Sequence, residues 1–417
     1  MAERGRAQQM TSVGTAQVRR IVRTLAHEGP RGLAQRVVRR AYRAVDAAGL
    51  DFPLLPGDIA DSASVAPQRS HARALPGVPT VGWLMTPPAL GSGGHTTIFR
   101  MVTALEAAGI RCVLFLYDRH GGDASTYAER IRVGWPRVQA AAVNVGDTID
   151  TVDGCFATSW ESAHVLALRA SRNLKCFYFI QDYEPFFYPR GSLYELAEDT
   201  YRFGFQHVAL GEMVAAAIRN EVGVDSDVVP FGCDSDVYKL APSATERTGV
   251  VFYAKPEVPR RGYVHARLAL EEFSRRHPEQ EIHVYGDKIT DLPMPVTWHG
   301  RMWPNDLNAL YNRTLGGFAM SFTNISLVAE EMLSAGCIPV VNDSPLARAD
   351  LDSPYVAWAR PTPHALADAL CQVVEHADPA ARAMSASASA RKGWGSARDG
   401  VVRIVEEALV GPRHDAR

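Results

Sequence analysis

Residues 321–341 read SFTNISLVAEEMLSAGCIPVV and combine a polar turn, a short helix and a buried strand. Asn324 and Ser326 are residue types that cap helices, because their side-chain oxygens accept bonds from first-turn amides. Gly336 is placed to end the helix in the left-handed conformation, and the apolar run at 338–341 predicts a strand. Free amides at such a helix start, with a carboxylate one turn later, suit a nucleotide diphosphate.

Glu330 and Glu331 are neighbours on this predicted helix and therefore point about 100° apart. Only one carboxylate can face the same space as the helix start. In that place it can hold ribose hydroxyls, as an acidic residue does in dinucleotide-binding folds. The alternative is an ordinary strand–helix–strand unit whose glutamates are both solvated.

The segment EEMLSAGCIPVV, residues 330–341, is similar to the donor-binding segment of GT-B glycosyltransferases, in particular family four. The pattern of that family is Glu, seven residues, Glu, and then a helix rich in small residues. Glu331 matches the second glutamate, whereas the first falls on Thr323, which leaves open how the sugar is held. With SFTNISL before the helix, the segment resembles the rhamnosyltransferase branch named after WsaF.

A predicted strand at residues 249–254 runs into three cations, Lys255, Arg260 and Arg261. Cations at a strand end can neutralise a leaving diphosphate, although a solvated basic turn would look the same. GT-B relatives place an Arg/Lys pair here. The resemblance assigns Lys255 to its first member and leaves Arg260 or Arg261 as the second; with Glu331 they form the predicted catalytic set.

The resemblance also implies donor-binding residues around the neighbouring strand ends. His299 and Gly300 fall where the family turns a loop toward the nucleotide base. The predicted donor-binding set is Gly93, Gly94, Tyr285, Gly286, His299, Gly300, Thr323, Asn324, Ser326 and Leu327.

A glycine loop, Gly91-Ser92-Gly93-Gly94-His95, separates a predicted strand at 80–85 from a predicted helix that starts at Thr96. Strand, glycine loop, helix and strand make a Rossmann-type unit. The G-x-G-x-x-G fingerprint is not met, so an NAD-dependent dehydrogenase is a poor fit. In GT-B enzymes the corresponding loop faces the donor phosphate and the acceptor.

A second polar and aromatic group, QDYEPFFY at residues 181–188, follows a predicted strand. Ligands of open α/β sheets lie outside the carboxyl ends of the strands. Carboxylates, an amide and aromatic rings in that place suit sugars, and the segment resembles the same rhamnosyltransferase branch; the alternative is an aromatic loop packed on a helix. The predicted acceptor-binding set is His95, Gln181, Asp182, Tyr183 and Glu184.

Two D-x-D triplets, at residues 225–227 and 234–236, look like the divalent-metal motif of GT-A enzymes. Such triplets are common in turns, and the second lies in PFGCDSDVY, residues 230–238, which is similar to the segment that closes the first domain of GT-B enzymes. No metal and no other cofactor is therefore expected; the nucleotide-sugar is a substrate.

The charge of the chain is distributed unevenly. Its 417 residues carry 44 basic and 46 acidic side chains, but the first 50 hold ten arginines against three acidic residues. The remainder is net negative, which argues against nucleic-acid binding. Residues 16–48 predict two basic amphipathic helices that can lie on an anionic membrane; packing on the catalytic body or on a second subunit is the alternative.

Six scattered cysteines, without a C-x-x-C pair, predict buried free thiols in a reducing compartment. The chain has neither an apolar run of spanning length nor a signal-peptide core. The prediction is a cytoplasmic protein, with residues 16–48 as a peripheral contact on the inner face of the plasma membrane.

The predicted fold is α/β of the GT-B type, with two Rossmann-like domains facing across a cleft. Residues 1–78 form the basic helical extension and linker, 79–240 the acceptor domain, and 241–395 the donor domain. Residues 396–417 are expected to form a helix that crosses back to the first domain. The sequence leaves the oligomeric state open.

The resemblance implies transfer of a sugar from a nucleotide-sugar, by family dTDP-rhamnose, to a hydroxyl of a glycan or lipid-linked glycan. It implies retention of the anomeric configuration, with a donor phosphate oxygen taking the acceptor proton. A nucleotide-sugar epimerase of GT-B shape and a non-catalytic scaffold remain alternatives, the latter because Thr323 replaces a glutamate.

Overall fold

The computed structural model describes residues 38, 52–65, 77–242, 246–325, 327–391 and 393–409. The chain divides into two compact units, Met1–Gly57 and Asp58–Arg417, and both sheets lie in the second unit. The helices expected within residues 16–48, apart from Val38, lie outside the described residues, so the membrane prediction stays a prediction.

Within the described residues, seven parallel strands form the first sheet, in a doubly wound order. From edge to edge they are β3 (Ala141–Asn144), β2 (Arg111–Leu116), β1 (Thr80–Met85), β4 (Gly154–Ala157), β5 (Lys175–Ile180), β6 (Gln206–Leu210) and β7 (Asp227–Val229). The inner strands are apolar on both faces, as KCFYFI in β5 illustrates, because helices cover both sides of a parallel sheet. We call residues 80–229 the first lobe.

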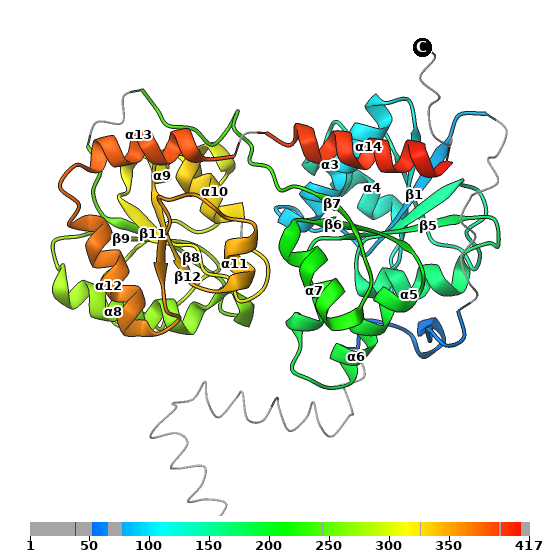
Figure 1. Ribbon diagram of the computed structural model, residues 1–417, viewed down its shortest axis with the longest axis horizontal. Coiled ribbons are helices and arrows are strands. Elements are labelled where there is room, and N and C mark those ends of the chain that lie inside the picture. The colour runs from blue at the N-terminus through cyan, green and yellow to red at the C-terminus, as the bar shows by residue number, and fades with distance from the viewer. Residues whose placement is uncertain are drawn as a thin grey trace, which may run out of the picture. The chain divides into compact units, whose positions relative to one another are not determined.

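Helices lie on both faces of this sheet (Figure 1). They are α3 (Gly93–Ala107), α4 (Ala124–Gly134), α5 (Trp160–Arg169), α6 (Ser192–Asp199) and α7 (Glu212–Val222), with short 3-10 turns at Pro56–Asp58, Glu184–Phe187 and Thr200–Arg202. The C-terminal helix α14 (Gly395–Leu409) packs on α3 and β7 and buries Val401, Ile404 and Val405. The chain thus returns to the first lobe after it has built the second.

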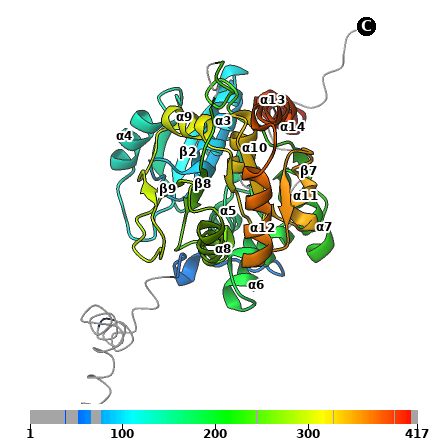
Figure 2. The same cartoon turned by 90° about the vertical axis from the view of Figure 1, so that its left-hand side faces the viewer.

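In the second lobe (residues 250–389), six described strands form another parallel sheet. They are β10 (Thr297–Trp298), β9 (Ile282–Gly286), β8 (Val250–Ala254), β11 (Gly316–Phe318), β12 (Ile338–Asn342) and β13 (Ala357–Ala359). Its helices are α8 (Tyr263–Arg276), α9 (Pro304–Arg313), α10 (Leu327–Ser334), α11 (Pro345–Ala349), α12 (Pro363–Val374) and α13 (Pro379–Ser389), and a 3-10 turn spans Pro259–Arg261. Helices α8 and α12 lie side by side (Figure 2).

The predicted strand–helix–strand unit is confirmed as β11, α10 and β12. Gly336 has a φ of +74°, which an L side chain rarely adopts. A Cβ there would also lie 2.9 Å from Ala383. Helix α10 begins at Leu327, directly after Ser326, which lies outside the described residues, and the side chain of the other predicted cap residue, Asn324, bonds to the first lobe.

All six cysteines are buried and unpaired with one another, as predicted. Among the helices that the structure describes, none is both long and apolar enough to cross a bilayer. The two parallel sheets with flanking helices confirm the α/β architecture expected from the sequence.

Candidate functional site

The two lobes meet at the carboxyl ends of β5 and β11. Thr323 Oγ1 donates to Asp182 Oδ2 at 2.7 Å, and the Asn324 backbone N–H donates to Asp182 Oδ1 at 3.2 Å. Asn324 Nδ2 also donates to the Gln181 carbonyl at 2.6 Å. Four residues that the sequence analysis singled out therefore lie together, two from each lobe.

Asp182 is buried, with an exposed fraction of 5%. Burial raises the pKa of its carboxyl, while Thr323, Arg261 and Arg260 act in the opposite direction. The carbonyl oxygen of the Asn324 side chain is also buried and has no hydrogen-bond partner among the described residues. This acceptor is available to a donor group of a ligand.

Arg260 and Arg261 lie beside this junction, in the 3-10 turn after β8. The Arg260 guanidinium stacks over the ring of Phe187, 4.0 Å from its centroid, which is a contact from the second lobe to the first. Its Nε is buried without a partner in the described structure. Arg261 Nη1 donates to Ser321 Oγ at 3.0 Å.

Burial lowers the pKa of Arg261, and the neighbouring charge of Arg260 lowers it further. The guanidinium groups of Arg260 and Arg261 repel each other and are partly removed from water. An anion that binds to both of them would stabilise the pair. A small hollow opens next to Arg261 and is lined by Phe252, Tyr253, Phe318, Ala319, Met320 and Val328. The arrangement can hold a phosphate or diphosphate.

Lys255, the third predicted cation, is paired within its own lobe. Its Nζ lies 3.1 and 3.2 Å from the two carboxylate oxygens of Asp287 and 5.6 Å from the centre of the Tyr253 ring. The side chain keeps 26% of its accessible surface. Lys255 can therefore reach a ligand only in competition with Asp287.

Glu330 and Glu331 point to different surroundings. Glu330 accepts the backbone N–H of Arg391 at 3.1 Å and forms an ion pair with the Arg391 side chain. Glu331 is part-exposed. Burial raises the pKa of its carboxyl to about 7, Asp234 raises it further, and Arg100 acts in the opposite direction. Of the two, Glu331 is the carboxylate that remains available.

Arg100 and Asp234 are a pair that the sequence analysis did not assign to this site. Arg100 lies in the middle of α3, forms an ion pair with Asp234 and stacks over Trp394 at 4.7 Å. In the sequence, Asp234 stands out as part of a D-x-D triplet and of the segment 230–238, neither of which indicates a contact with Arg100. Nothing in the sequence around Arg100 predicts that this arginine lies near Glu331. The contact depends on the packing of α3 against the chain segment that contains Trp394 and α14.

The glycine loop differs from the expectation, because α3 begins at Gly93 instead of Thr96. Ser92 caps the helix, and its hydroxyl lies 2.9 Å from Nδ1 of His95. Nε2 of the same ring donates to the Thr86 carbonyl at 3.2 Å, and burial lowers the pKa of this histidine. Gly94 lies next to Gln181, whose amide nitrogen would be 3.7 Å from a Cβ, whereas Gly93 borders open space.

Four predicted donor-binding residues, Tyr285, Gly286, His299 and Gly300, form a separate group at the ends of β9 and β10. The Gly286 N–H donates to the Gly300 carbonyl at 2.8 Å, but the His299 ring faces His283, with 3.1 Å between nitrogens. Tyr285 is buried and its hydroxyl lies 2.6 Å from that of Tyr311.

Tyr253, which was not predicted, is also part-exposed in this region and stacks on Tyr285 at 4.8 Å. Of the two remaining predicted donor residues, Leu327 is part-buried at the start of α10, and Ser326 lies outside the described residues.

Tyr183 and Glu184 do not face the other lobe. The Tyr183 ring is fully buried and stacks on Tyr201, and its hydroxyl donates to Glu198 at 3.1 Å. The Glu184 carboxylate accepts the Trp160 backbone N–H and the Tyr178 hydroxyl. These two side chains belong to the core of the first lobe, since their partners all lie in that lobe.

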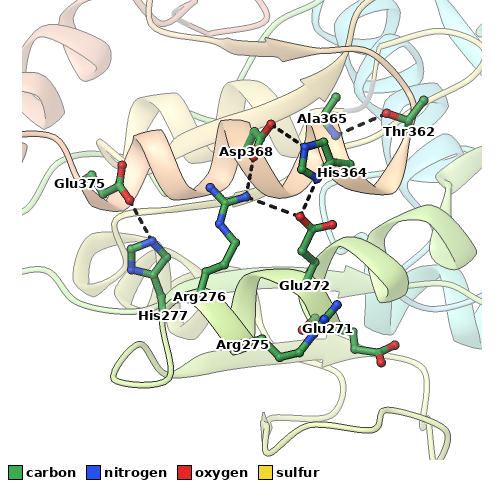
Figure 3. A network of polar contacts seen from close by, with 10 residues as sticks. All are labelled: Glu271, Glu272, Arg275, Arg276, His277, Thr362, His364, Ala365, Asp368 and Glu375. Carbon is green, nitrogen blue, oxygen red and sulfur yellow. Dashed lines mark hydrogen bonds and ion pairs between the residues drawn. The ribbon is translucent and has the colours of Figure 1, made fainter.

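The first carboxylate of each D-x-D triplet pairs with an arginine, Arg219 for Asp225 and Arg100 for Asp234. Elsewhere in the described structure, Glu272, His364 and Asp368 could offer three metal ligands on α8 and α12. Figure 3 shows Arg276 against both carboxylates and His364 between them. This network joins α8 to α12 by ion pairs and lies on the surface.

Comparison with known proteins finds a match to models of the same family within each lobe. The model of the WsaF N-terminal domain matches residues 149–212, and that of the WsaF C-terminal domain matches residues 248–371. The O-antigen biosynthesis protein RfbC of Myxococcus xanthus is 28% identical over 294 residues. That match covers 66% of this chain but only 23% of RfbC, so the chain corresponds to a small part of that relative.

Solved structures share the fold at low sequence identity. HepE of Anabaena, in complex with UDP-glucose, superposes with a TM-score of 0.61 and 14% identity over 79% of this chain and 99% of its own. TarM superposes with a TM-score of 0.60 and 9% identity over 79% and 96%. WaaG, a glycosyltransferase involved in lipopolysaccharide biosynthesis, gives 0.53 and 12% over 80% and 100%. A WsaF domain model thus matches within each lobe, and the chain has the GT-B fold.

Proposed function

We propose that the chain is a glycosyltransferase of cell-surface polysaccharide biosynthesis, which moves a sugar from a nucleotide-sugar to a hydroxyl of a glycan. The observation that carries the proposal is the junction of the two lobes, where Arg260 and Arg261 lie beside Asp182 and Thr323. Cations for a diphosphate and hydrogen-bonding groups for sugar hydroxyls then meet at the carboxyl ends of two parallel sheets.

The donor sugar that we propose is rhamnose, carried by dTDP. The support is the WsaF match in both lobes. The relatives in solved structures bind UDP or UDP-glucose in their own sites, which supports a nucleotide-sugar donor in general and leaves the base to experiment. We further propose retention of configuration and no requirement for a divalent metal.

In the proposed reaction, the bond between the anomeric carbon and the diphosphate oxygen breaks while the acceptor oxygen bonds to the same carbon. The acceptor proton passes to an oxygen of the departing diphosphate. Arg260 and Arg261 neutralise that leaving group, and Lys255 joins them when it exchanges Asp287 for phosphate. Glu331 accepts hydroxyl hydrogens of the donor, and Gln181 and Asp182 face the acceptor side.

The first experiment is a thermal-shift screen of the full chain with dTDP, UDP and GDP. A nucleotide that binds only the folded protein stabilises it by about 2.7 kcal/mol at a concentration of 100 times its Kd. Stabilisation by none of the three would exclude nucleotide-sugar chemistry and favour a scaffold.

The second experiment separates a transferase from an epimerase of the same shape. The preferred nucleotide-sugar is incubated with and without a glycan acceptor, and the products are identified by mass spectrometry and NMR. A transferase releases nucleoside diphosphate and extends the acceptor. Isomerisation of the donor alone would identify the protein as an epimerase.

We also propose that the chain works at the inner face of the plasma membrane, with residues 16–48 as its contact to anionic lipid. The support is the excess of arginine in this segment and the expectation that the acceptor is a lipid-linked glycan. Lipid binding would place the enzyme on the surface that carries its substrate.

A further inference from the structure

Glu161 is a carboxylate of the first lobe that the reaction described above does not use. It is the second residue of α5, directly after the carboxyl end of β4. The start of this helix is already capped, since Ser159 accepts the Ser162 N–H and the Glu184 carboxylate accepts the Trp160 N–H. The helix therefore does not require Glu161 as a cap.

The surroundings of Glu161 are acidic and aromatic. Its charge raises the pKa of the Glu184 carboxyl and of the Tyr188 hydroxyl, so both groups lie close enough to interact with it. Burial raises the pKa of its carboxyl although the Ser159 hydroxyl favours the ionised form. Among the described residues no Lys, Arg or His forms an ion pair with it.

Tyr188 links Glu161 to the junction between the lobes. Its hydroxyl accepts the Trp160 Nε1–H at 3.1 Å, so the hydroxyl hydrogen stays available. The adjacent residue Phe187 carries the Arg260 guanidinium on its ring, and the charge of Arg260 also reaches Tyr188. Glu161 and Tyr188 are both part-exposed, so a ligand at Arg260 has these two groups as neighbours.

An unpaired, part-desolvated carboxylate beside aromatic rings suits a neutral polyol better than an anion. Sugar hydroxyls donate to the carboxylate without adding charge, and the nonpolar face of a sugar ring packs on an aromatic side chain. A phosphate is disfavoured next to an ionised Glu161, because like charges repel.

We propose that Glu161, assisted by the Tyr188 hydroxyl, binds hydroxyl groups of the acceptor sugar on the first-lobe side of the site. The inference rests on the proposed transferase function and adds a specificity-determining residue to it. It assigns the acceptor, and not the donor, to the end of β4.

The test measures sugar binding to the full chain, saturated with whichever of dTDP, UDP or GDP stabilises it. The probes are the methyl glycosides of rhamnose, glucose, galactose, mannose and N-acetylglucosamine, followed by saturation-transfer NMR. Glu161→Gln is expected to weaken the best-bound glycoside by about ten- to a hundredfold. Tyr188→Phe should weaken it less, and Glu161→Asp should restore part of the loss. Glu195→Gln, a matched change at an exposed position of α6, should bind as the wild type does.

Two controls keep the result specific to the acceptor. The thermal shift with nucleotide should be the same in all variants, and the melting temperature of Glu161→Gln should not fall, since a desolvated charge beside Glu184 is removed. Glycoside binding by Glu161→Gln equal to that of the wild type overturns the inference. So does nucleotide binding by the wild type with no glycoside bound, whereas failure to bind any nucleotide would contradict the proposed function itself.

Discussion

Asp350 of the second lobe caps helix α7 of the first. Its Oδ1 accepts the Glu212 backbone N–H at 2.8 Å, and its Oδ2 accepts that of Met213 at 2.9 Å. The carboxylate is buried and can approach because Gly211 has no Cβ, which would lie 2.5 Å from Oδ2. A helix cap that comes from the other lobe ties the stability of α7 to the contact between the lobes.

Asp350→Ala should therefore destabilise the folded chain by about 1–2 kcal/mol, the usual effect of removing an N-cap. Urea denaturation measures the loss, and hydrogen exchange should accelerate at the amides of Glu212 and Met213. The exposed neighbour Asp352 offers a control: Asp352→Ala should change neither quantity. Unchanged exchange in Asp350→Ala would mean that the cap does not persist in solution.

Glu331→Gln and Glu330→Gln should have different effects. Glu331→Gln removes a charge-assisted bond to the donor and should lower donor affinity about ten- to a hundredfold. Glu330→Gln should leave donor affinity alone and instead reduce stability, because it weakens the contact with Arg391. Calorimetric titration and urea denaturation separate the two effects. Equal losses of donor affinity would contradict the assignment.

Donor affinity should also depend on pH through Glu331. Its pKa is raised to about 7, so the carboxylate that accepts hydroxyl bonds is increasingly protonated as pH falls below 7, and affinity should decline there. The stability of the fold should change with pH in the opposite direction. Between pH 4.5 and 7 the folded chain binds more protons at Glu331 than the unfolded chain does, so the contribution of Glu331 to the free energy of unfolding falls as pH rises. Both trends should be absent in Glu331→Gln.

His207 should make the first lobe sensitive to acid. It is buried beside Tyr178 and Tyr201, and neither ring nitrogen has a partner among the described residues. Burial lowers its pKa from 6.5 to about 4. The unfolded chain therefore binds more protons, and stability should fall by about 3 kcal/mol as pH drops from 6.5 to 4.

Urea denaturation across this range should show the loss in the wild type and a flatter profile in His207→Phe. His120→Gln, a substitution at an exposed histidine, is the control and should follow the wild type. If His207→Phe lost stability with acid as steeply as the wild type, other groups would have to be responsible.

Turnover should persist in excess EDTA after exhaustive dialysis, because the cationic turn at Arg260 and Arg261 can take the role of a metal at the diphosphate. The comparison is the same assay with added manganese or magnesium. Complete loss of activity in EDTA, with recovery on addition of manganese, would show that a divalent ion is required.

The arginine-rich N-terminus should bind anionic vesicles, since each basic residue near the surface contributes roughly 1 kcal/mol. The full chain should sediment with anionic but not neutral vesicles, and less so as salt is raised. A chain that begins at Arg73 should remain in the supernatant and still bind nucleotide. Identical behaviour of the two would identify the segment as a packing or oligomer surface.

The architecture of the two lobes can be predicted from the amino-acid pattern alone. Apolar runs of strand length, separated by amphipathic helices, predict parallel sheets, because local burial patterns follow the period of each element. Gly336 marks the end of α10, since its backbone conformation is a local property. The helical period likewise separates Glu330 from Glu331, whose side chains lie in different surroundings.

Which loops meet depends on packing between distant segments. Asn324 has the pattern of a helix cap, but its side chain bonds to Gln181 of the other lobe. Tyr183 and Glu184 have the pattern of acceptor ligands, but their own lobe buries them. The bond between Asp182 and Thr323 spans 141 residues of sequence and could not be foreseen. The hydrophobic period of a helix or strand indicates which of its faces is buried. The partners of a loop side chain depend on tertiary packing, which a local sequence pattern does not contain.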